Sequence, residues 1–341
     1  MRLLILTQVV DRNDPVLGFF HEWINAFALH FESITVICLK KGVYNLPHNV
    51  RVFSLGKEEG KNRFTYVLRF FTCIISLRNE YDSVFVHMNQ EYVLLGGIIW
   101  KIFRKRVSMW RNHHAGSFLT DIASFFCDQV FCTSKYSYTA KYKKIIFMPV
   151  GIDADVFYPR DVTRKNNTLL FIARIAPPKN LHLIIDALII LKHKGLDLEL
   201  DVYGAPLPKD EAYFENIKQS VKTHRLQVIF HGPIKNTETP SIYTSHDICI
   251  NMSSSGMYDK TIFEAMACGC LSIASNKNLV GLVKDIFIVN QDDAHDLAQK
   301  LETIVGLDLE QKNAYRSELR NIVVMHHSLR SLAEKIHTVL L

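Results

Sequence analysis

Short apolar segments alternate with longer amphipathic segments along the whole chain. This alternation predicts repeated strand–helix–strand units, and therefore parallel sheets covered by helices. Each half of the chain has enough strands for a sheet of its own. The predicted strands are 3–6, 33–38, 83–86, 107–110, 129–132 and 145–147 in the first half, and 169–173, 198–203, 228–231, 247–251, 271–274 and 286–289 in the second.

The pattern predicts an α/β protein with two Rossmann-like lobes. We expect an N-terminal lobe over residues 1–150 and a C-terminal lobe over 168–325. The segment 151–167, GIDADVFYPRDVTRKNN, is rich in charge and turn-forming residues and is predicted to be the hinge or linker. Segment 326–341 has apolar residues at helical spacing, which predicts a final helix.

Length and composition agree with two globular lobes. The chain has 341 residues, of which 48% are hydrophobic and 22% charged, as in ordinary folded proteins. The N-terminal run is too short and polar for a signal peptide, and the longest uncharged apolar stretch, 92–100, is far shorter than the ~20 residues that span a bilayer. The seven cysteines form no C-x-x-C pair, which indicates reduced thiols and no metal site. We therefore expect a cytoplasmic protein.

Charge is distributed unevenly. Residues 1–150 carry 19 Lys and Arg against 11 Asp and Glu, whereas residues 151–341 carry 21 against 23. Segments 63–78 and 97–106 also mix aromatic, aliphatic and basic residues. They fit either helices at a membrane interface or helices buried on one face, and the basic half fits either an anionic partner or a solvated surface.

Two cations follow the first strand of the C-terminal lobe. In FIARIAPPKN, Arg174 ends the strand and Lys179 precedes a helix. A strand end followed by a helix N-terminus collects free backbone N–H groups, and two cations there can close on a diphosphate. The alternative is that both are ordinary surface charges.

A Ser- and Gly-rich loop leads into a second short helix of this lobe. Glu264 stands in the otherwise small and apolar helix TIFEAMACG, where its carboxylate needs a partner such as a ribose hydroxyl. A capping or salt-bridge role is the alternative. The loop 253–260 precedes this helix, so its hydroxyl and N–H groups point to where phosphate or sugar oxygens could sit.

Candidate residues of the N-terminal lobe follow predicted strands. Gly18 opens a helix after the first strand, and His113 and His114 follow the strand at 107–110. His87 is a weaker candidate. Ligands of open α/β sheets bind at such carboxyl ends, although paired histidines also occur in solvated turns. The chain lacks the G-x-G-x-x-G and Walker A motifs, which argues against an NAD enzyme and an NTPase.

In this order and spacing, the motifs resemble retaining glycosyltransferase family four, of GT-B fold with two lobes facing a central cleft. The similarity includes PVGIDADVF, the segment from Tyr243 to Asp247 and EAMACG. It implies that the C-terminal lobe binds a UDP- or GDP-linked sugar, that the N-terminal lobe binds the acceptor, and that the last helix packs back on the N-terminal lobe. It also implies donor contacts from Gly18, His113, His114, Arg174, Lys179, Glu264 and the loop residues Ser254, Ser255, Gly256, Met257, Asp259, Lys260 and Thr261.

One position departs from the family pattern. The family has Glu eight residues before the position of Glu264, where this chain has Gly256, and the nearby Asp259 occupies the place of a family Gly. The alternatives are therefore a silent GT-B binding partner, an epimerase and a hydrolase. The expected reaction is sugar transfer to an acceptor hydroxyl with retention, in bacterial surface glycan or glycolipid synthesis.

The expected partners are the nucleotide-sugar donor and a glycan or lipid-linked acceptor, with peripheral membrane contact through the basic lobe and no nucleic acid. No metal or other cofactor is expected. Asp153 and Asp155 form a D-x-D string, which we interpret as coincidental because it lies in the hinge segment.

Overall fold

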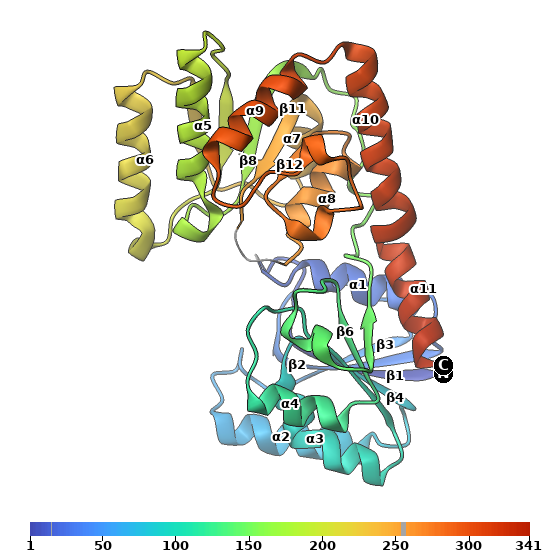
Figure 1. The fold of residues 1–341 in the computed structure, drawn as a ribbon. Coiled ribbons are helices and arrows are strands. Elements are labelled where there is room, and N and C mark those ends of the chain that lie inside the picture. Colours follow the sequence, from blue (N-terminus) through green and yellow to red (C-terminus); the bar gives the residue numbers. More distant parts are fainter. Residues whose placement is uncertain (15, 254–256) are drawn as a thin grey trace. The chain divides into compact units, whose positions relative to one another are not determined.

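The computed structural model describes residues 1–14, 16–253 and 257–341. The chain forms two compact units (Figure 1). The N-terminal unit consists of Met1–Gly151 and Leu329–Leu341, and the C-terminal unit consists of Ile152–Ser328.

The N-terminal unit contains a parallel sheet with the strand order β3-β2-β1-β4-β5-β6-β7. Its central strands carry continuous apolar runs because helices cover both faces of the sheet. The strands are β1 (Arg2–Val10), β2 (Ser33–Lys41), β3 (Val50–Ser54), β4 (Ser83–His87), β5 (Arg106–Trp110), β6 (Gln129–Cys132) and β7 (Ile145–Phe147).

Two helical layers enclose this sheet. Helices α1 (Phe19–Ala28) and α11 (Leu329–Leu340) share one apolar core with one face of the sheet. Helices α2 (Arg63–Ser76), α3 (Gln90–Ile102) and α4 (Phe118–Phe126) share a second core with the other face. The C-terminal helix thus belongs to the N-terminal unit, where its apolar stripe packs beside α1 (Figure 1).

The C-terminal unit contains a second parallel sheet, with the order β10-β9-β8-β11-β12. Its strands are β8 (Lys165–Ile172), β9 (Leu200–Tyr203), β10 (Val228–Gly232), β11 (His246–Asn251) and β12 (Leu271–Ala274). The helices that follow them are α5 (Leu181–His193), α6 (Glu211–Thr223), α7 (Thr239–Ser245), α8 (Lys260–Ala267), α9 (Ala294–Val305) and α10 (Leu309–Ile322).

Each sheet reverses its strand order once. The reversal lies between β1 and β4 in the N-terminal unit and between β8 and β11 in the C-terminal unit. At such a switch point the two connecting segments leave in opposite directions, which opens a crevice at the carboxyl ends of the two strands. The fold therefore provides a place for a ligand beside the segments that follow β8 and β11.

The structure differs from the predicted elements in three places. Strand β3 was not predicted, because the exposed Arg51 interrupts its apolar pattern at the sheet edge. The strand predicted at 286–289 is instead a short 3₁₀ turn, with a single bridge from Ile288 to Ala274. Most of the predicted linker packs in the C-terminal unit, since Phe157 lies buried beside Tyr243 and β8 already begins at Lys165.

Two further observations concern the chain as a whole. Among the described residues, no helix is both long and apolar enough to cross a bilayer. All seven cysteines carry free thiols, and six of them are buried.

Candidate functional site

Lys179 lies at the switch point of the C-terminal sheet, in the turn between β8 and α5. Its Nζ donates hydrogen bonds to Asp259 Oδ2 at 2.5 Å and to Ser253 Oγ at 3.1 Å. Ser253 Oγ in turn donates to the same oxygen of Asp259, at 3.2 Å. The structure therefore brings together a cation, a hydroxyl and a carboxylate from the segments that follow β8 and β11.

Asparagine side chains fix the two segments against each other. Asn180, in a left-handed conformation with φ 53°, donates from Nδ2 to Met252 O at 3.0 Å and to Asp292 Oδ1 at 3.1 Å. Asn251, the last residue of β11, donates to Thr261 Oγ1 at 2.9 Å and accepts from Ser253 N. These bonds fix the backbone after β8 and the backbone after β11, and the Lys179 side chain contacts Ser253 and Asp259 between them.

Asp259 caps the N-terminus of α8. Its Oδ1 accepts from the backbone N and the hydroxyl of Thr261. Burial alone would raise the pKa of the Asp259 carboxyl, but the Lys179 ammonium and these hydrogen bonds outweigh it and hold the pKa below its usual value. The carboxylate is therefore ionised at neutral pH and partly neutralises Lys179.

Glu264 lies on α8, one helical turn after Lys260. Its Oε2 accepts a hydrogen bond of 3.3 Å from the hydroxyl of Tyr243, a fully buried residue of α7. Burial raises the pKa of the Glu264 carboxyl, and the neighbouring positive charge of Lys260 acts in the opposite direction. The carboxylate predicted to meet a ribose thus has protein partners, Tyr243 and Lys260, and remains partly accessible to solvent.

The remaining predicted donor residues of this unit differ in surroundings. The Arg174 side chain is exposed, and among the described residues it makes no hydrogen bond or ion pair. Met257 is buried, and its carbonyl accepts from Asn276 Nδ2 at 2.7 Å. The predicted residues Ser254, Ser255 and Gly256 lie outside the described residues.

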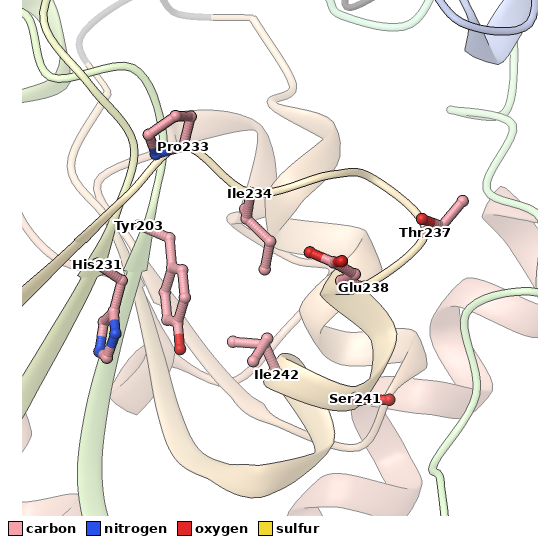
Figure 2. Close-up of a pocket in the computed structure, with 8 residues that line it drawn as sticks. All are labelled: Tyr203, His231, Pro233, Ile234, Thr237, Glu238, Ser241 and Ile242. Carbon is pink, nitrogen blue, oxygen red and sulfur yellow. The ribbon is translucent and has the colours of Figure 1, made fainter.

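A pocket of about 460 Å³ opens beside α7, and sequence reasoning missed it. Tyr203 and His231, from neighbouring strands, form one wall with their rings stacked at 4.3 Å between centroids (Figure 2). The opposite wall comes from α7 and the segment before it, including Glu238 and Ile242 (Figure 2). Ile242 lines the pocket, and the next residue of α7, Tyr243, donates to Glu264.

A buried carboxylate holds the His231 ring in place. Asp201 accepts from Nε2 of His231 at 2.5 Å and from Nε2 of the buried His246 at 2.8 Å. Burial raises the pKa of Asp201, but the hydrogen bonds from the two imidazoles outweigh it and keep the pKa below its usual value. The sequence did not indicate that Asp201 is buried, because Asp201 alternates with Leu200 and Val202 and would be expected on the polar face of the strand.

In the N-terminal unit, His113 and His114 lie in the loop after β5. Their rings are exposed and stacked at 4.5 Å between centroids. The backbone carbonyl of His113 accepts from Tyr138 N at 2.9 Å and from Ser137 Oγ at 3.2 Å, so the loop is anchored while both imidazoles face solvent. Both histidines therefore lie at the carboxyl end of a strand, accessible to a ligand.

Two other candidates of the N-terminal unit have packing roles. Gly18 precedes α1 in a tight turn, where a Cβ would stand 2.6 Å from the carbonyl oxygen of Asp14. His87 is buried and stacks on Phe20 at 3.8 Å between centroids, with Nδ1 at 3.3 Å from the hydroxyl of Thr7. His87, the last residue of β4, thus lies at the switch point of this sheet but is buried, whereas Gly18 lies in the segment that follows β1.

A fully buried carboxylate, Asp247, lies at the amino end of β11 with cationic partners that sequence reasoning missed. It accepts from Lys312 Nζ at 2.9 Å, from Arg316 and from the backbone of Asn167. These partners hold α10 to the sheet. In the hinge segment, Asp153 accepts from the backbone of Asp155 at 3.0 Å, and nowhere in the described part of the chain do three His, Cys, Asp or Glu side chains gather as a metal site requires.

Comparison with known proteins agrees with this architecture. Residues 166–306 match the family model described as glycosyl transferases group 1. No curated protein matches the sequence.

Several solved structures share the fold over nearly their whole length. The structure of Anabaena Alr3699/HepE in complex with UDP has a TM-score of 0.79 at 18% identity, covering 100% of this chain and 99% of that one. Sucrose-phosphate synthase from Thermosynechococcus elongatus has a TM-score of 0.77 at 16% identity, covering 99% and 98%. A glycosyltransferase from Rickettsia africae also has a TM-score of 0.77 at 16% identity, covering 99% and 97%.

The two parallel sheets, and the solved structures that share them over nearly the whole chain, confirm the predicted GT-B fold. Residues 166–306 are similar to the glycosyl transferases group 1, and the resemblance to retaining family four is consistent with this match.

Proposed function

We propose that the protein transfers a sugar from a nucleotide-sugar donor to an acceptor hydroxyl, with retention of the anomeric configuration. The observation that carries this proposal is the contact of Lys179 with Ser253 and Asp259 at the switch point of the C-terminal sheet. A diphosphate bound there would meet the Lys179 ammonium, the exposed Arg174 and the N-terminus of α8. The ribose of the nucleotide would meet Glu264.

Donor binding would change the partners of Lys179. In the free protein its charge is partly neutralised by Asp259, at 2.5 Å. The phosphate oxygens would share or take over this ammonium, while Asp259 keeps its hydrogen bonds to Thr261 at the start of α8. Asp259 thus holds Lys179 extended toward the donor before the donor arrives, which reduces the cost of ordering the side chain.

The reaction needs no nucleophile from the protein. The bond from the anomeric carbon to the diphosphate oxygen breaks, and a bond to the acceptor oxygen forms on the same face of the sugar. The acceptor proton passes to the departing diphosphate. Lys179 and Arg174 would stabilise the negative charge that develops on that diphosphate, and His113 would contact the transferred sugar. No metal is needed for these steps.

The donor class is proposed from the solved structures and from the pocket beside α7. Solved structures of the Anabaena protein contain UDP, UDP with glucose, and UDP-glucose, so UDP-sugars are the first donors to test here, with GDP-sugars next. The pocket beside α7 has an aromatic wall on which a base could stack. We propose a glycan or lipid-linked acceptor in bacterial surface glycan or glycolipid synthesis, reached by peripheral contact of the N-terminal unit with the membrane.

The proposal is tested by measuring nucleotide release from UDP-, GDP- and ADP-sugars, with and without lipid extract as the source of acceptor. We expect release from one donor class, and a loss of at least about tenfold in Lys179→Ala and Glu264→Gln, because each variant removes one contact to the donor. Lys194→Ala is the matched control, since Lys194 makes an exposed ion pair with Glu302 in the same unit.

Three outcomes would contradict the proposal. Donor binding without release under any acceptor would indicate a silent binding protein. Interconversion of free sugar nucleotides without an acceptor would indicate an epimerase, and release to water alone would indicate a hydrolase. Retention is tested separately, by assigning the anomeric configuration of the product by NMR.

A further inference from the structure

Helix α2 is apolar on the side that faces solvent. Phe64, Leu68 and Ile75 are 71%, 52% and 43% exposed, and their spacing places them on one face of the helix. The opposite face packs Phe70 and Ile74 into the core against the sheet. A helix at a protein surface normally turns charged and polar residues outward, so the outer face of α2 needs a separate explanation.

The two other helices of the same layer repeat this pattern. On α3, Ile98 and Ile102 are 59% and 70% exposed, while on α4, Phe118 and Phe125 are 74% and 77% exposed. All three helices bury their inner faces in the same core on one side of the sheet, so their outer faces point away from it together (Figure 1). We call these outward residues of α2, α3 and α4 the outer apolar face.

Such a patch is absent from a comparable outer helix of the C-terminal unit. On α6 the exposed side chains other than Ala212 are polar, among them Glu211, Glu215, Gln219 and Lys222. Contiguous apolar patches on a soluble protein usually mark an interaction surface. The outer apolar face therefore belongs to the layer of α2, α3 and α4, and the average hydrophobicity of the chain does not explain it.

Basic side chains border the outer apolar face. Arg63 begins α2 and Arg104 follows α3, both exposed and outside any ion pair among the described residues. Two acidic residues near this layer are paired, Asp121 with Lys141 at 2.9 Å and Asp128 with Lys101 at 2.6 Å, whereas Glu91 in the first turn of α3 is exposed and makes no ion pair among the described residues. The border therefore presents the positive charges of Arg63 and Arg104 to a partner, with Glu91 as one exposed negative charge on α3.

We propose that the outer apolar face docks on an anionic lipid bilayer, with Phe64, Ile98 and Phe125 inserted among the acyl chains near the head groups. Arg63 and Arg104 then meet the lipid phosphates. Exposed aromatic and aliphatic side chains bordered by Arg and Lys match the chemistry of an interfacial surface. This proposal names the surface through which the N-terminal unit would contact the membrane. It rests on the proposed function only for the identity of the acceptor.

The position of α4 connects this surface to the candidate site of the same unit. The loop that carries His113 and His114 runs directly into α4, whose N-terminus is capped by Ser117 and Thr120. Docking through Phe118 and Phe125 would therefore hold this loop near the head groups, where the reactive hydroxyl of a lipid-linked acceptor lies.

The test is co-sedimentation of the whole protein with vesicles of phosphatidylcholine alone or mixed with phosphatidylglycerol. We expect tighter binding to the mixed vesicles. In the double variant Ile98→Glu, Phe125→Glu, we expect the partition coefficient to fall at least about tenfold, because two carboxylates would have to enter the interface. Leu29→Glu is the matched control, since Leu29 is 83% exposed beside α1, in the other helical layer of the same unit.

Each alternative result decides the question. Wild-type protein that does not sediment, or a double variant that sediments as well as Leu29→Glu, would overturn the proposal. So would a dimer that the double variant dissociates, because a second copy would then cover the face. Binding that does not depend on phosphatidylglycerol would remove the role of Arg63 and Arg104. Lys179→Ala should bind vesicles as the wild type does, which keeps this test separate from the test of glycosyl transfer.

Discussion

At the residue scale, the carboxylates of Asp247 and Asp259 in the C-terminal unit act in different ways. Asp247 is fully buried and surrounded by Lys312, Arg316 and the backbone of Asn167, so it holds elements together. Asp259 makes one ion pair, with Lys179, at the carboxyl ends of the central strands. A ligand phosphate can replace Asp259 as a partner, whereas no ligand can reach Asp247.

Replacing Asp247 by Asn tests the structural role. The change leaves Lys312 and Arg316 buried without a counter-charge, and we expect the free energy of unfolding at neutral pH to fall by about 3 kcal/mol. Urea denaturation measures this loss. Asp197→Asn is the control, because the ion pair of Asp197 with Lys192 is exposed, and a similar loss in both variants would contradict the prediction.

The difference in stability between the wild type and Asp247→Asn should depend on pH. Burial alone would raise the pKa of Asp247, but the hydrogen bonds from Lys312 and Asn167 hold it below its usual value of 3.8. Since the pKa is lower in the folded than in the unfolded state, this carboxylate contributes full stability above about pH 4 and loses it as the pH falls through the folded-state value. The stability difference between wild type and Asp247→Asn should therefore shrink in acid.

The sequence predicted some of these residues better than others. Lys179 and Asp259 lie beside recognisable strand ends and a helix start, so both could be predicted as candidates, although their mutual contact could not. Lys312 and Arg316 are one helical turn apart in a charged segment, a pattern typical of a solvated helix face. Nothing in the sequence indicates that both are buried against Asp247.

At the scale of elements, the position of α11 could not be predicted from the spacing of its apolar residues alone. The spacing predicts an amphipathic helix but not the surface that it covers. In the structure its buried residues, among them Leu332 and Ile336, join the core of the N-terminal unit beside α1. Gly151, with φ 77°, lets the backbone pass close to Trp23 and Leu332 before it enters the second unit.

Leu332→Ala tests this packing. Leu332 is fully buried, and loss of its side chain should lower the free energy of unfolding by about 3 kcal/mol through lost burial and the cavity left behind. Glu334→Ala, an exposed change on the same helix, should have little effect. Thermal or urea unfolding of the two variants gives the comparison, and equal stability would show that α11 is not part of this core.

Two short segments show where the strand predictions were wrong, one strand that was missed and one that was predicted but does not form. Strand β3 lies at the edge of its sheet and exposes Arg51 between Val50 and Val52, so it has no continuous apolar run. The apolar run at 286–289 resembles a strand, but it makes only one bridge, between Ile288 and Ala274. Short apolar segments do not distinguish a strand from a buried turn, because both bury their side chains.

At the scale of the whole molecule, two parallel sheets could be predicted because alternation of strands and helices repeats over the full chain. The order of the strands, and hence the switch point between β8 and β11, could not be predicted from that pattern alone. The same holds for the pocket beside α7 and the outer apolar face, since each is formed by residues from separate elements. Sequence spacing describes one element at a time.

The central claim is that Lys179 at this switch point binds the diphosphate of a nucleotide. Calorimetric titration of the wild type, Lys179→Ala and Lys194→Ala with UDP and GDP tests it most directly. We predict binding of one nucleotide that weakens at least about tenfold in Lys179→Ala, equivalent to about 1.4 kcal/mol, and remains unchanged in Lys194→Ala. Unchanged affinity in Lys179→Ala would contradict the account, because the diphosphate would then lie elsewhere.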